Sequence, residues 1–245
     1  MKFAMILAAG EGRRMRPLTN KMPKPLIQVA GKTLLERHIE GLVSAGFTDL
    51  VINASYLSDQ VVAFCGDGQQ WGCRIHLSLE ETPLETAGGI RKALPLLKEE
   101  SFAVVNGDVF TDYPLARLTE VELGDDVAHL VMVPNPEHHP SGDFAVSDAR
   151  VVTGESDKAT FSGLSVMSHR LFDGLEQDFA PLRPLFDRAI ASGQVSGELW
   201  SGVWSDVGTP QRLSELEFRL SSNACLLYTS PSPRDVEESR MPSSA

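Results

Sequence analysis

The first half of the chain alternates short apolar runs with segments whose apolar residues recur at helical spacing. The apolar runs are short enough for buried strands and cover residues 3–9, 50–54, 102–105 and 127–133, while residues 74–79 alternate with period two. Helical spacing covers residues 32–45, 57–64 and 86–97, with Gly46 as a stop for the first helix and Ser58 as a candidate cap for the second. Strands that alternate with helices across short connections predict an α/β fold around a mixed, mainly parallel sheet.

A different pattern follows Pro134. Residues 143–152 and 160–167 are typical of antiparallel strands, 182–192 have the spacing of an amphipathic helix, and 200–207 are strand-like. Thr209 and Pro210 are a favourable cap and first-turn pair for a helix over residues 211–220. We expect one domain over residues 1–220, in which the second half, from about residue 135, covers the first, about 1–134.

The end of the chain has a different composition. Residues 221–245 are rich in Ser and Pro and show no period, which predicts disorder. Residues 225–235 also resemble translated adapter or vector sequence, so we expect a non-native tail.

Charge and cysteine content narrow the classes of function. The 22 Lys and Arg residues against 33 Asp and Glu residues give a net charge of −11, which argues against a nucleic-acid binder. The three cysteines form no CxxC pair and no zinc-type cluster with histidine, as is typical of a reducing compartment. The apolar runs are far shorter than the ~20 residues that span a bilayer, and the N-terminus is a poor signal peptide. We therefore expect a cytoplasmic enzyme or binding protein without a membrane partner.

Chemically unusual stretches directly follow three of the predicted strands, after Ala9, after Leu79 and after Val105. Because the carboxyl ends of parallel strands meet at one edge of a sheet, these stretches can converge on one site.

The loop after the first strand combines small residues with arginines. Gly10 and Gly12 let backbone N–H groups approach a phosphate or a base closely. Arg13, Arg14 and Arg16 follow, and guanidinium groups bind phosphate oxygens. A purely structural turn explains the two glycines equally well.

Two further stretches have backbone features that favour binding. Lys24 lies between two prolines, which hold the backbone around its charge, although a solvated lysine in a rigid turn fits the same pattern. Thr86 is a candidate cap for a helix that begins Ala-Gly-Gly, and Gly88 and Gly89 each weaken a helix by roughly 1 kcal/mol relative to Ala. A ligand lying against the backbone would explain that cost, and so would close packing.

Two aspartates are candidates for metal binding. Asp108 follows Asn106 at the end of an apolar strand, and Asp206 precedes the last predicted helix. Mg²⁺ prefers one or two carboxylates together with phosphate oxygens. The alternatives are an Asx turn at Asp108 and a capped helix start after Asp206.

In their order along the chain, these stretches resemble the sugar-1-phosphate nucleotidylyltransferases. The matching stretches are LAAGEGRRMRPLT, MPKPL, ETAGG, VNGD and WSDVGTP, and the resemblance runs from about residue 3 to about residue 220. Within that family, the N-acetylmuramate 1-phosphate uridylyltransferases of bacterial cell-wall (peptidoglycan) recycling are the most similar. The stretches that carry this finer resemblance are PLETAGGIRKALPLL, VNGDVFTDY, NPEHHPSGDF, TFSGLSV and VSGELWSGVWSDVGT.

The resemblance implies a Rossmann-like (GT-A-like) nucleotidyltransferase fold, a three-layer α/β/α arrangement with a nucleotide-binding first half and a sugar-binding second half. It also implies Mg²⁺-dependent transfer of a uridylyl group from UTP to a sugar 1-phosphate, giving a UDP-sugar and pyrophosphate. The sugar phosphate is already an anion at pH 7, so no catalytic base or triad is needed, and the chain has no triad-like set of residues.

The same resemblance implies roles for individual residues. The residues that it implies for nucleotide binding are Ala8, Ala9, Gly10, Glu11, Gly12, Arg13, Lys24, Glu81, Thr86, Gly88 and Gly89. Binding of the acceptor sugar falls to Asn106, Gly142, Glu155, Phe161 and Gly163. Catalysis falls to Arg13, Lys24, Asp108 and Asp206, with the two aspartates as the Mg²⁺ ligands.

Two other hypotheses stay open. The acceptor could be a glucose-, mannose- or glycerol-type phosphate with dTTP, GTP or CTP as donor, or the chain could be a catalytically silent nucleotide-sugar sensor. Many relatives carry Gly where this chain has Glu85, which weakens any inference about the base from the wider family. We expect His138 and His139 to lie in an exposed loop without a metal.

Overall fold

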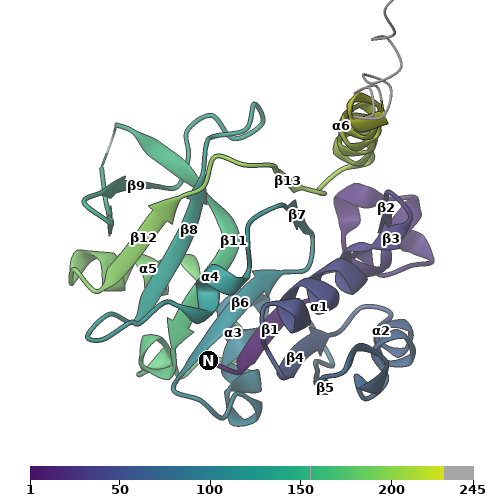
Figure 1. Ribbon diagram of the computed structural model, residues 1–245. Coiled ribbons are helices and arrows are strands. Elements are labelled where there is room, and N and C mark those ends of the chain that lie inside the picture. The colour runs from purple at the N-terminus through teal and green to yellow at the C-terminus, as the bar shows by residue number, and fades with distance from the viewer. Residues whose placement is uncertain (155, 229–245) are drawn as a thin grey trace, which may run out of the picture.

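The computed structural model describes residues 1–154 and 156–228, of which 223–228 by backbone alone. Nine strands in this part of the chain form one sheet in the order β5-β4-β1-β6-β11-β8-β12-β10-β9 (Figure 1). Their bounds, in chain order, are β1 Phe3–Leu7, β4 Asp49–Ala54, β5 Arg74–Leu79, β6 Ser101–Asn106, β8 Ala128–Val133, β9 Phe144–Ser147, β10 Arg150–Val152, β11 Lys158–Ser168 and β12 Val195–Leu199.

The sheet is mixed. Strands β5, β4, β1 and β6 are parallel to one another, and β8 is parallel to β12. Strand β11 is antiparallel to both β6 and β8, and β10 is antiparallel to its neighbours β12 and β9. The expectation of a mainly parallel sheet therefore fits the first half of the chain, whereas the second half adds antiparallel pairs.

The second half of the chain extends the sheet of the first half, whereas we expected it to cover the first half within one domain. Strand β11 pairs with β6 over five register positions, from Leu164 opposite Val105 to Ser168 opposite Ser101. The sheet therefore continues without a break from one half to the other.

Helices cover both faces of the sheet. The α-helices are α1 Leu34–Ser44, α2 Ser58–Cys65, α3 Glu85–Ala93, α4 Ala116–Thr119, α5 Arg183–Ala191 and α6 Pro210–Tyr228. Short 3₁₀ helices η1 to η6 cover Arg13–Met15, Leu18–Asn20, Lys24–Leu26, Gln69–Trp71, Leu94–Leu96 and His169–Phe172. Among the helices of residues 1–154 and 156–228, none is both long and apolar enough to cross a membrane.

Helix boundaries confirm some of the expected caps and correct others. Gly46 adopts φ +97° after α1, and the Thr209 hydroxyl accepts the Arg212 N–H at 3.3 Å to cap α6. Ser58 and Thr86 do not act as caps, because α2 and α3 begin at Ser58 itself and at Glu85, one residue before Thr86.

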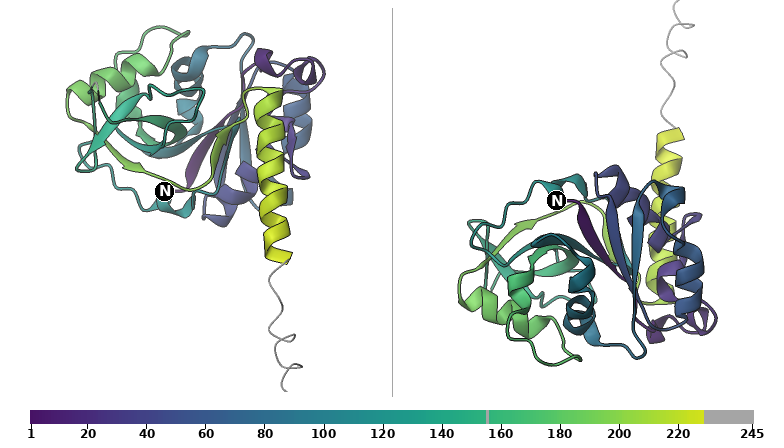
Figure 2. Two further views of the ribbon diagram at one scale, coloured as in Figure 1. Left: turned by 90° about the horizontal axis from the view of Figure 1, so that it is seen from above. Right: turned by 90° about the horizontal axis from the view of Figure 1, so that it is seen from below.

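Helix α6 continues beyond its expected end. It runs to Tyr228, so residues 221–228 are helical, contrary to our prediction that disorder begins at 221 (Figure 2). The rest of the predicted tail, 229–245, lies outside the described residues.

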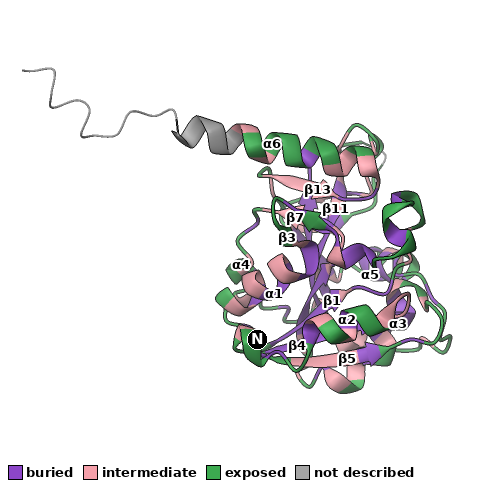
Figure 3. Cartoon of the chain, turned by 90° about the vertical axis from the view of Figure 1, so that its right-hand side faces the viewer, coloured by how far each residue is buried: buried purple, intermediate pink, exposed green. Residues whose placement is uncertain are grey.

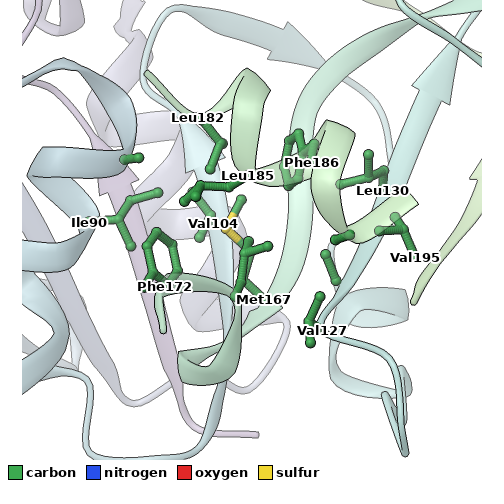
Figure 4. Close-up of a cluster of buried hydrophobic side chains, with 14 of the residues drawn as sticks. Ile90, Val104, Val127, Leu130, Met167, Phe172, Leu182, Leu185, Phe186 and Val195 are labelled. Carbon is green, nitrogen blue, oxygen red and sulfur yellow. The ribbon is translucent and has the colours of Figure 1, made fainter. Parts of the chain in front are cut away.

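Two apolar clusters lie on opposite faces of the sheet, which confirms the three-layer arrangement. Along β1, Phe3 and Met5 belong to one cluster and Ala4 and Ile6 to the other. Helices α3 and α5 cover the first face, where side chains such as Ile90, Leu185 and Phe186 pack together (Figure 4). Helix α1 and part of α2 cover the second face, and the central strands β1 and β4 are buried between the two layers (Figure 3).

Two short two-stranded ribbons lie outside the main sheet. Strands β2 (Gln28–Val29) and β3 (Lys32–Thr33) form one, against which α6 packs. Strands β7 (Val109–Thr111) and β13 (Trp204–Asp206) form the other and pair antiparallel. The β7–β13 ribbon joins segments from the two halves of the chain, and the sequence pattern does not predict β7 or β12.

Candidate active site

The polar residues that end neighbouring strands meet at one edge of the sheet, as the sequence predicts. Leu7, the last residue of β1, is in register with Asn53 of β4 on one side and with Asn106 of β6 on the other. Glu80 directly follows β5, the next strand beyond β4. The stretches that follow β1, β5 and β6 therefore begin at the same edge of the sheet.

A cavity of about 660 Å³ lies over these strand ends. Ten of the residues assigned above line it, namely Ala8, Ala9, Gly10, Glu11, Gly12, Arg13, Lys24, Thr86, Asn106 and Asp108. Its other lining residues are Leu7, Arg14, Pro25, Asn53, Glu80, Pro83, Leu84, Glu85, Phe179 and Gly208. We call this space the first cavity.

A buried hydrogen-bond network forms one end of the first cavity. The Asn53 side chain accepts the Ala8 N–H at 2.8 Å and donates to Glu80 Oε1 at 2.7 Å. Glu80 Oε2 accepts the Leu84 N–H at 3.0 Å, and Glu80 is only 5% exposed. Hydrogen bonds of this kind are what allows a carboxylate to remain buried, and they hold the ends of β1, β4 and β5 and the start of α3 in place.

Lys24 and Asp108 form an ion pair at the other end of the first cavity. Lys24 belongs to η3, which follows extended Pro23, and its Nζ lies 2.5 Å from Asp108 Oδ2. The lysine side chain is 11% exposed and the aspartate side chain 34% exposed, so the pair is partly shielded from water. The structure therefore supports the view that the two prolines position Lys24 and does not support the solvated alternative.

A second cavity, of about 350 Å³, adjoins the first at Asp108. Arg14, Asn106 and Asp108 line both cavities. The remaining residues of the second cavity are Val109, His138, His139, Thr160, Phe161, Ser162, Trp204 and Asp206. The two aspartates chosen from the sequence thus line one space.

The β7–β13 ribbon explains how Asp108 and Asp206 come together. Asp206 is in register with Val109, and the Val207 N–H donates to the Asp108 carbonyl at 2.8 Å. The Trp204 indole also donates to the Ser162 carbonyl at 2.9 Å, which anchors the ribbon to β11. Backbone pairing therefore brings the two carboxylates together although they are far apart in sequence.

Asp206 is surrounded by nitrogen donors. Arg212 in the first turn of α6 donates to both carboxylate oxygens, at 2.7 and 2.5 Å, and His138 Nε2 lies 3.0 Å from Oδ1. In the described part of the chain, no group of three or more His, Cys, Asp or Glu side chains is arranged to hold a metal. Two carboxylates that line one cavity nevertheless fit Mg²⁺, which takes its other ligands from phosphate oxygens and water.

The structure distinguishes Arg13 from its neighbour Arg14. The Arg13 guanidinium binds both oxygens of Glu11, at 2.5 and 3.0 Å, and its side chain is 74% exposed. This contact raises the pKa of Arg13 and lowers the pKa of Glu11. Arg14 lines both cavities, whereas Arg13 lines only the first. Arg14 is therefore better placed to contact a group that lies where the two cavities meet.

Three residues chosen for the nucleotide do not line either cavity. Glu81 is exposed, and its neighbour Glu80 faces the first cavity instead. A Cβ on Gly88 would lie 2.0 Å from the Asp178 carbonyl oxygen, and one on Gly89 would lie 2.8 Å from Glu80 Oε1. Close packing therefore explains both glycines, and the ligand-contact interpretation is not supported for them.

Each of the two glycines chosen for the sugar has a structural reason of its own. Gly163 has φ +83°, and a Cβ there would lie 2.6 Å from Asn106 Nδ2, so this glycine lets Asn106 approach β11. Gly142, at φ +61°, packs against Asn135 and the Lys158 backbone. Phe161 does line the second cavity, and Glu155 lies outside the described residues.

Several lining residues were not identified from the sequence. His139 is held by Asp143 at 3.3 Å, and with His138 it forms a wall of the second cavity, where the sequence suggested only an exposed loop. Glu85 adopts φ +62°, a left-handed conformation that costs a non-glycine residue about 1–2 kcal/mol. The signal in the sequence for this conformation was that many relatives carry Gly at the position of Glu85.

Comparisons with known proteins agree with this architecture. Residues 3–146 match the nucleotidyl transferase family. The chain is 46% identical over 222 residues to an N-acetylmuramate alpha-1-phosphate uridylyltransferase of Neisseria meningitidis, covering 87% of this chain and 96% of the relative. A protein of the same name from Caulobacter vibrioides is 36% identical over 236 residues, covering 90% and 97%.

A solved structure shows the same fold. The crystal structure of HddC from Yersinia pseudotuberculosis complexed with GMP-PN superposes with a TM-score of 0.75 at 21% identity, covering 90% of this chain and 100% of that one. The family match spans more than half of the chain, and the Neisseria and Caulobacter relatives align over nearly their full lengths. The chain therefore belongs to the nucleotidyl transferase family.

Proposed function

We propose that this protein transfers a uridylyl group from UTP to N-acetylmuramate alpha-1-phosphate, giving a UDP-sugar and pyrophosphate. The observation that carries the proposal is the position where the two cavities meet, where Lys24, Asp108 and Arg14 lie together and Asp206 lines the adjoining wall. The 46% identity to a uridylyltransferase of that specificity supports this choice of substrates.

The order of the strands suggests how the nucleotide lies. The α-phosphate belongs near Asp108, which follows β6, and the base belongs near Glu80, which follows β5. These strands are three positions apart in the sheet, roughly 14 Å at about 4.8 Å per strand. The acceptor sugar then occupies the second cavity, beside Phe161 and His139.

The chemical difficulty is the approach of one phosphate to another. The sugar phosphate oxygen attacks the α-phosphorus of UTP, the bond to the β-phosphate oxygen breaks, and pyrophosphate leaves. The nucleophile is already charged, so this chain supplies positioning and positive charge, without a general base. Lys24 and Arg14 bind the phosphates and stabilise the charge that develops during transfer.

We further propose that Asp108 and Asp206 hold Mg²⁺. When bound, the ion neutralises phosphate charge and keeps the reacting groups in line. Lys24, Arg212 and His138 keep the two carboxylates ordered at the cavity wall. A role in cytoplasmic peptidoglycan recycling follows from this choice of acceptor and is part of the same proposal.

A substrate screen tests the proposal. Purified protein with Mg²⁺ would be given UTP, dTTP, GTP or CTP together with N-acetylmuramate, N-acetylglucosamine, glucose or mannose 1-phosphate, and pyrophosphate release would be measured. We expect UTP with N-acetylmuramate 1-phosphate to have the highest kcat/KM, and Asp108→Asn to abolish release. A higher kcat/KM for another pair would reject the assigned substrates. Binding of a UDP-sugar without turnover of any pair would favour the sensor hypothesis.

A further inference from the structure

An exposed aromatic side chain lies at the first cavity. Phe179 is 60% exposed, although it lines the cavity together with Pro83 and Leu84. Most of the large apolar side chains in the described residues are buried in the core, so a phenyl ring that is exposed in a cavity leaves apolar surface in contact with water. A ligand with a flat apolar face would cover that surface.

The segment that carries Phe179 is tied to the start of α3. The Ala180 carbonyl accepts the Ala87 and Gly88 N–H groups at 2.9 and 3.1 Å, and the Ala180 N–H donates to the Leu84 carbonyl at 3.1 Å. Arg91 also donates to Asp178 at 2.9 Å. These contacts hold the backbone on both sides of Phe179, so the ring is part of an ordered wall of the first cavity.

Gly88 is the residue that allows this contact. A side chain there would collide with the Asp178 carbonyl oxygen, since the distance to a Cβ would be 2.0 Å. The absence of a side chain at Gly88 therefore gives the ETAGG stretch, residues 85–89, a structural role. It lets a segment from the second half of the chain reach the nucleotide end of the first cavity.

The position of Phe179 along the cavity identifies the part of the ligand that it meets. Its neighbour Ala180 bonds to Leu84, and Leu84 bonds to Glu80 at the β5 end of the sheet edge. Lys24 and Asp108 lie at the β6 end. A nucleotide whose phosphates lie at the Asp108 end therefore has its base at the end where Phe179 is located.

We propose that Phe179 is a binding residue for the nucleobase, against whose face its ring packs. The inference rests on the proposed nucleotide function and adds that a segment of the sugar-binding half completes the base pocket. Stacking on an aromatic ring tolerates any base, because every base has a π-face. Phe179 therefore contributes affinity for the base and does not by itself select one base over another.

Equilibrium binding to the full-length protein tests the role of Phe179. We would measure the Kd of UTP by calorimetry for the wild type and for Phe179→Ala, Phe179→Leu and Phe179→Trp. Phe218→Ala is the matched control, because Phe218 is 73% exposed on α6 and lines neither cavity. Inorganic tripolyphosphate, which has no base, would be measured against the same variants.

We expect Phe179→Ala to weaken UTP binding by roughly five- to a hundredfold, the range for loss of one base–aromatic contact. Phe179→Leu should lie between Ala and the wild type, and Phe179→Trp should bind UTP nearly as the wild type does. Tripolyphosphate affinity and the KM for the sugar phosphate should not change, and Phe218→Ala should behave as the wild type.

Two results would overturn the inference. One is unchanged UTP affinity in Phe179→Ala. The other is an equal loss of UTP and tripolyphosphate affinity in Phe179→Leu at an unchanged melting temperature, which would mean that the ring does not act on the base. Repeating the series with dTTP, GTP and CTP separates this inference from the proposed function. If another nucleotide binds best and depends on Phe179, the assignment of UTP fails and the role of Phe179 stands.

Discussion

The side chains around the phosphate end of the site are charge-paired, with one exception. Asp108 pairs with Lys24, Asp206 with Arg212, and Glu11 with Arg13, each with a closest N–O distance of 2.5 Å. Arg14 has no ion pair among the described residues, and it lines both cavities. A guanidinium without a carboxylate partner has its hydrogen-bond donors free for an incoming phosphate, whereas those of Arg13 already bind Glu11.

This contrast predicts different consequences for the two neighbouring arginines. Arg14→Ala should lower kcat/KM for nucleotide by about two orders of magnitude, as expected for a group that stabilises developing phosphate charge. Arg13→Ala should lower it by less than about fivefold, because loss of an exposed, paired charge costs little. Steady-state kinetics on both variants, with melting temperatures as the control for folding, would measure the difference. The opposite ranking would restore Arg13 as the catalytic arginine.

Strand β11 shows how an irregular element shapes the site. Its register against β8 shifts between Phe161 and Leu164, and Gly163 in this bulge adopts φ +83°. The bulge brings the Gly163 backbone against the Asn106 side chain and leaves Phe161 at the second cavity. The sequence predicted a strand here, but a bulge depends on the partner strands and has no periodic signal of its own.

A pair of glycine substitutions isolates the effect of this close approach. Gly163→Ala and Gly193→Ala both place a side chain at positive φ, but only the first meets a neighbour, since nothing lies within 4 Å of a Cβ on Gly193. We expect Gly193→Ala to cost about 1–2 kcal/mol of unfolding free energy, and Gly163→Ala about 1–3 kcal/mol more. Urea denaturation measures both. If the two substitutions cost the same unfolding free energy, the Asn106 side chain moves away without a penalty. The kcat of Gly163→Ala would then show whether the position of Asn106 matters for the reaction.

The two halves of the chain form one continuous molecule around the site. The sheet runs from β5 to β9, the β7–β13 ribbon joins the halves beside Asp108, and the 178–180 segment reaches back to α3. His38 of α1 is buried next to Val109 of this ribbon. Burial lowers the pKa of His38 to about 4, against smaller opposing effects of Asp108 and the Val109 backbone.

Buried His38 makes the stability of the whole molecule depend on pH. The unfolded chain takes up a proton on this histidine near pH 6.5, whereas the folded protein does so only near pH 4. Stability is therefore greatest above pH 6.5 and falls as the pH decreases from 6.5 to 4. We expect melting temperatures to show this fall, and His38→Gln to reduce it while leaving the curve flat above pH 7. An unchanged slope in His38→Gln would assign the effect to other groups.

The local sequence pattern was enough to predict many of the strands and helices of this protein and its family. Apolar runs and helical spacing located β1, β4, β6, β8 and α1, because burial on both faces of a central strand leaves a continuous apolar signal. Motif order was enough for the family, since the stretches that follow the strands carry the chemistry. The same motifs contain Lys24 and Asp108, which line the first cavity, and Asp206, which lines the adjoining second cavity with Asp108.

The tertiary structure was needed to decide which of two adjacent residues in a motif lines a cavity. Arg14 lines both cavities whereas Arg13 lines only the first, and Glu80 rather than Glu81 lines the first cavity. Phe179 gained its place from contacts with α3, a helix distant in sequence. Such long-range packing leaves no local pattern, because the partners of each residue are set by the path of the whole chain.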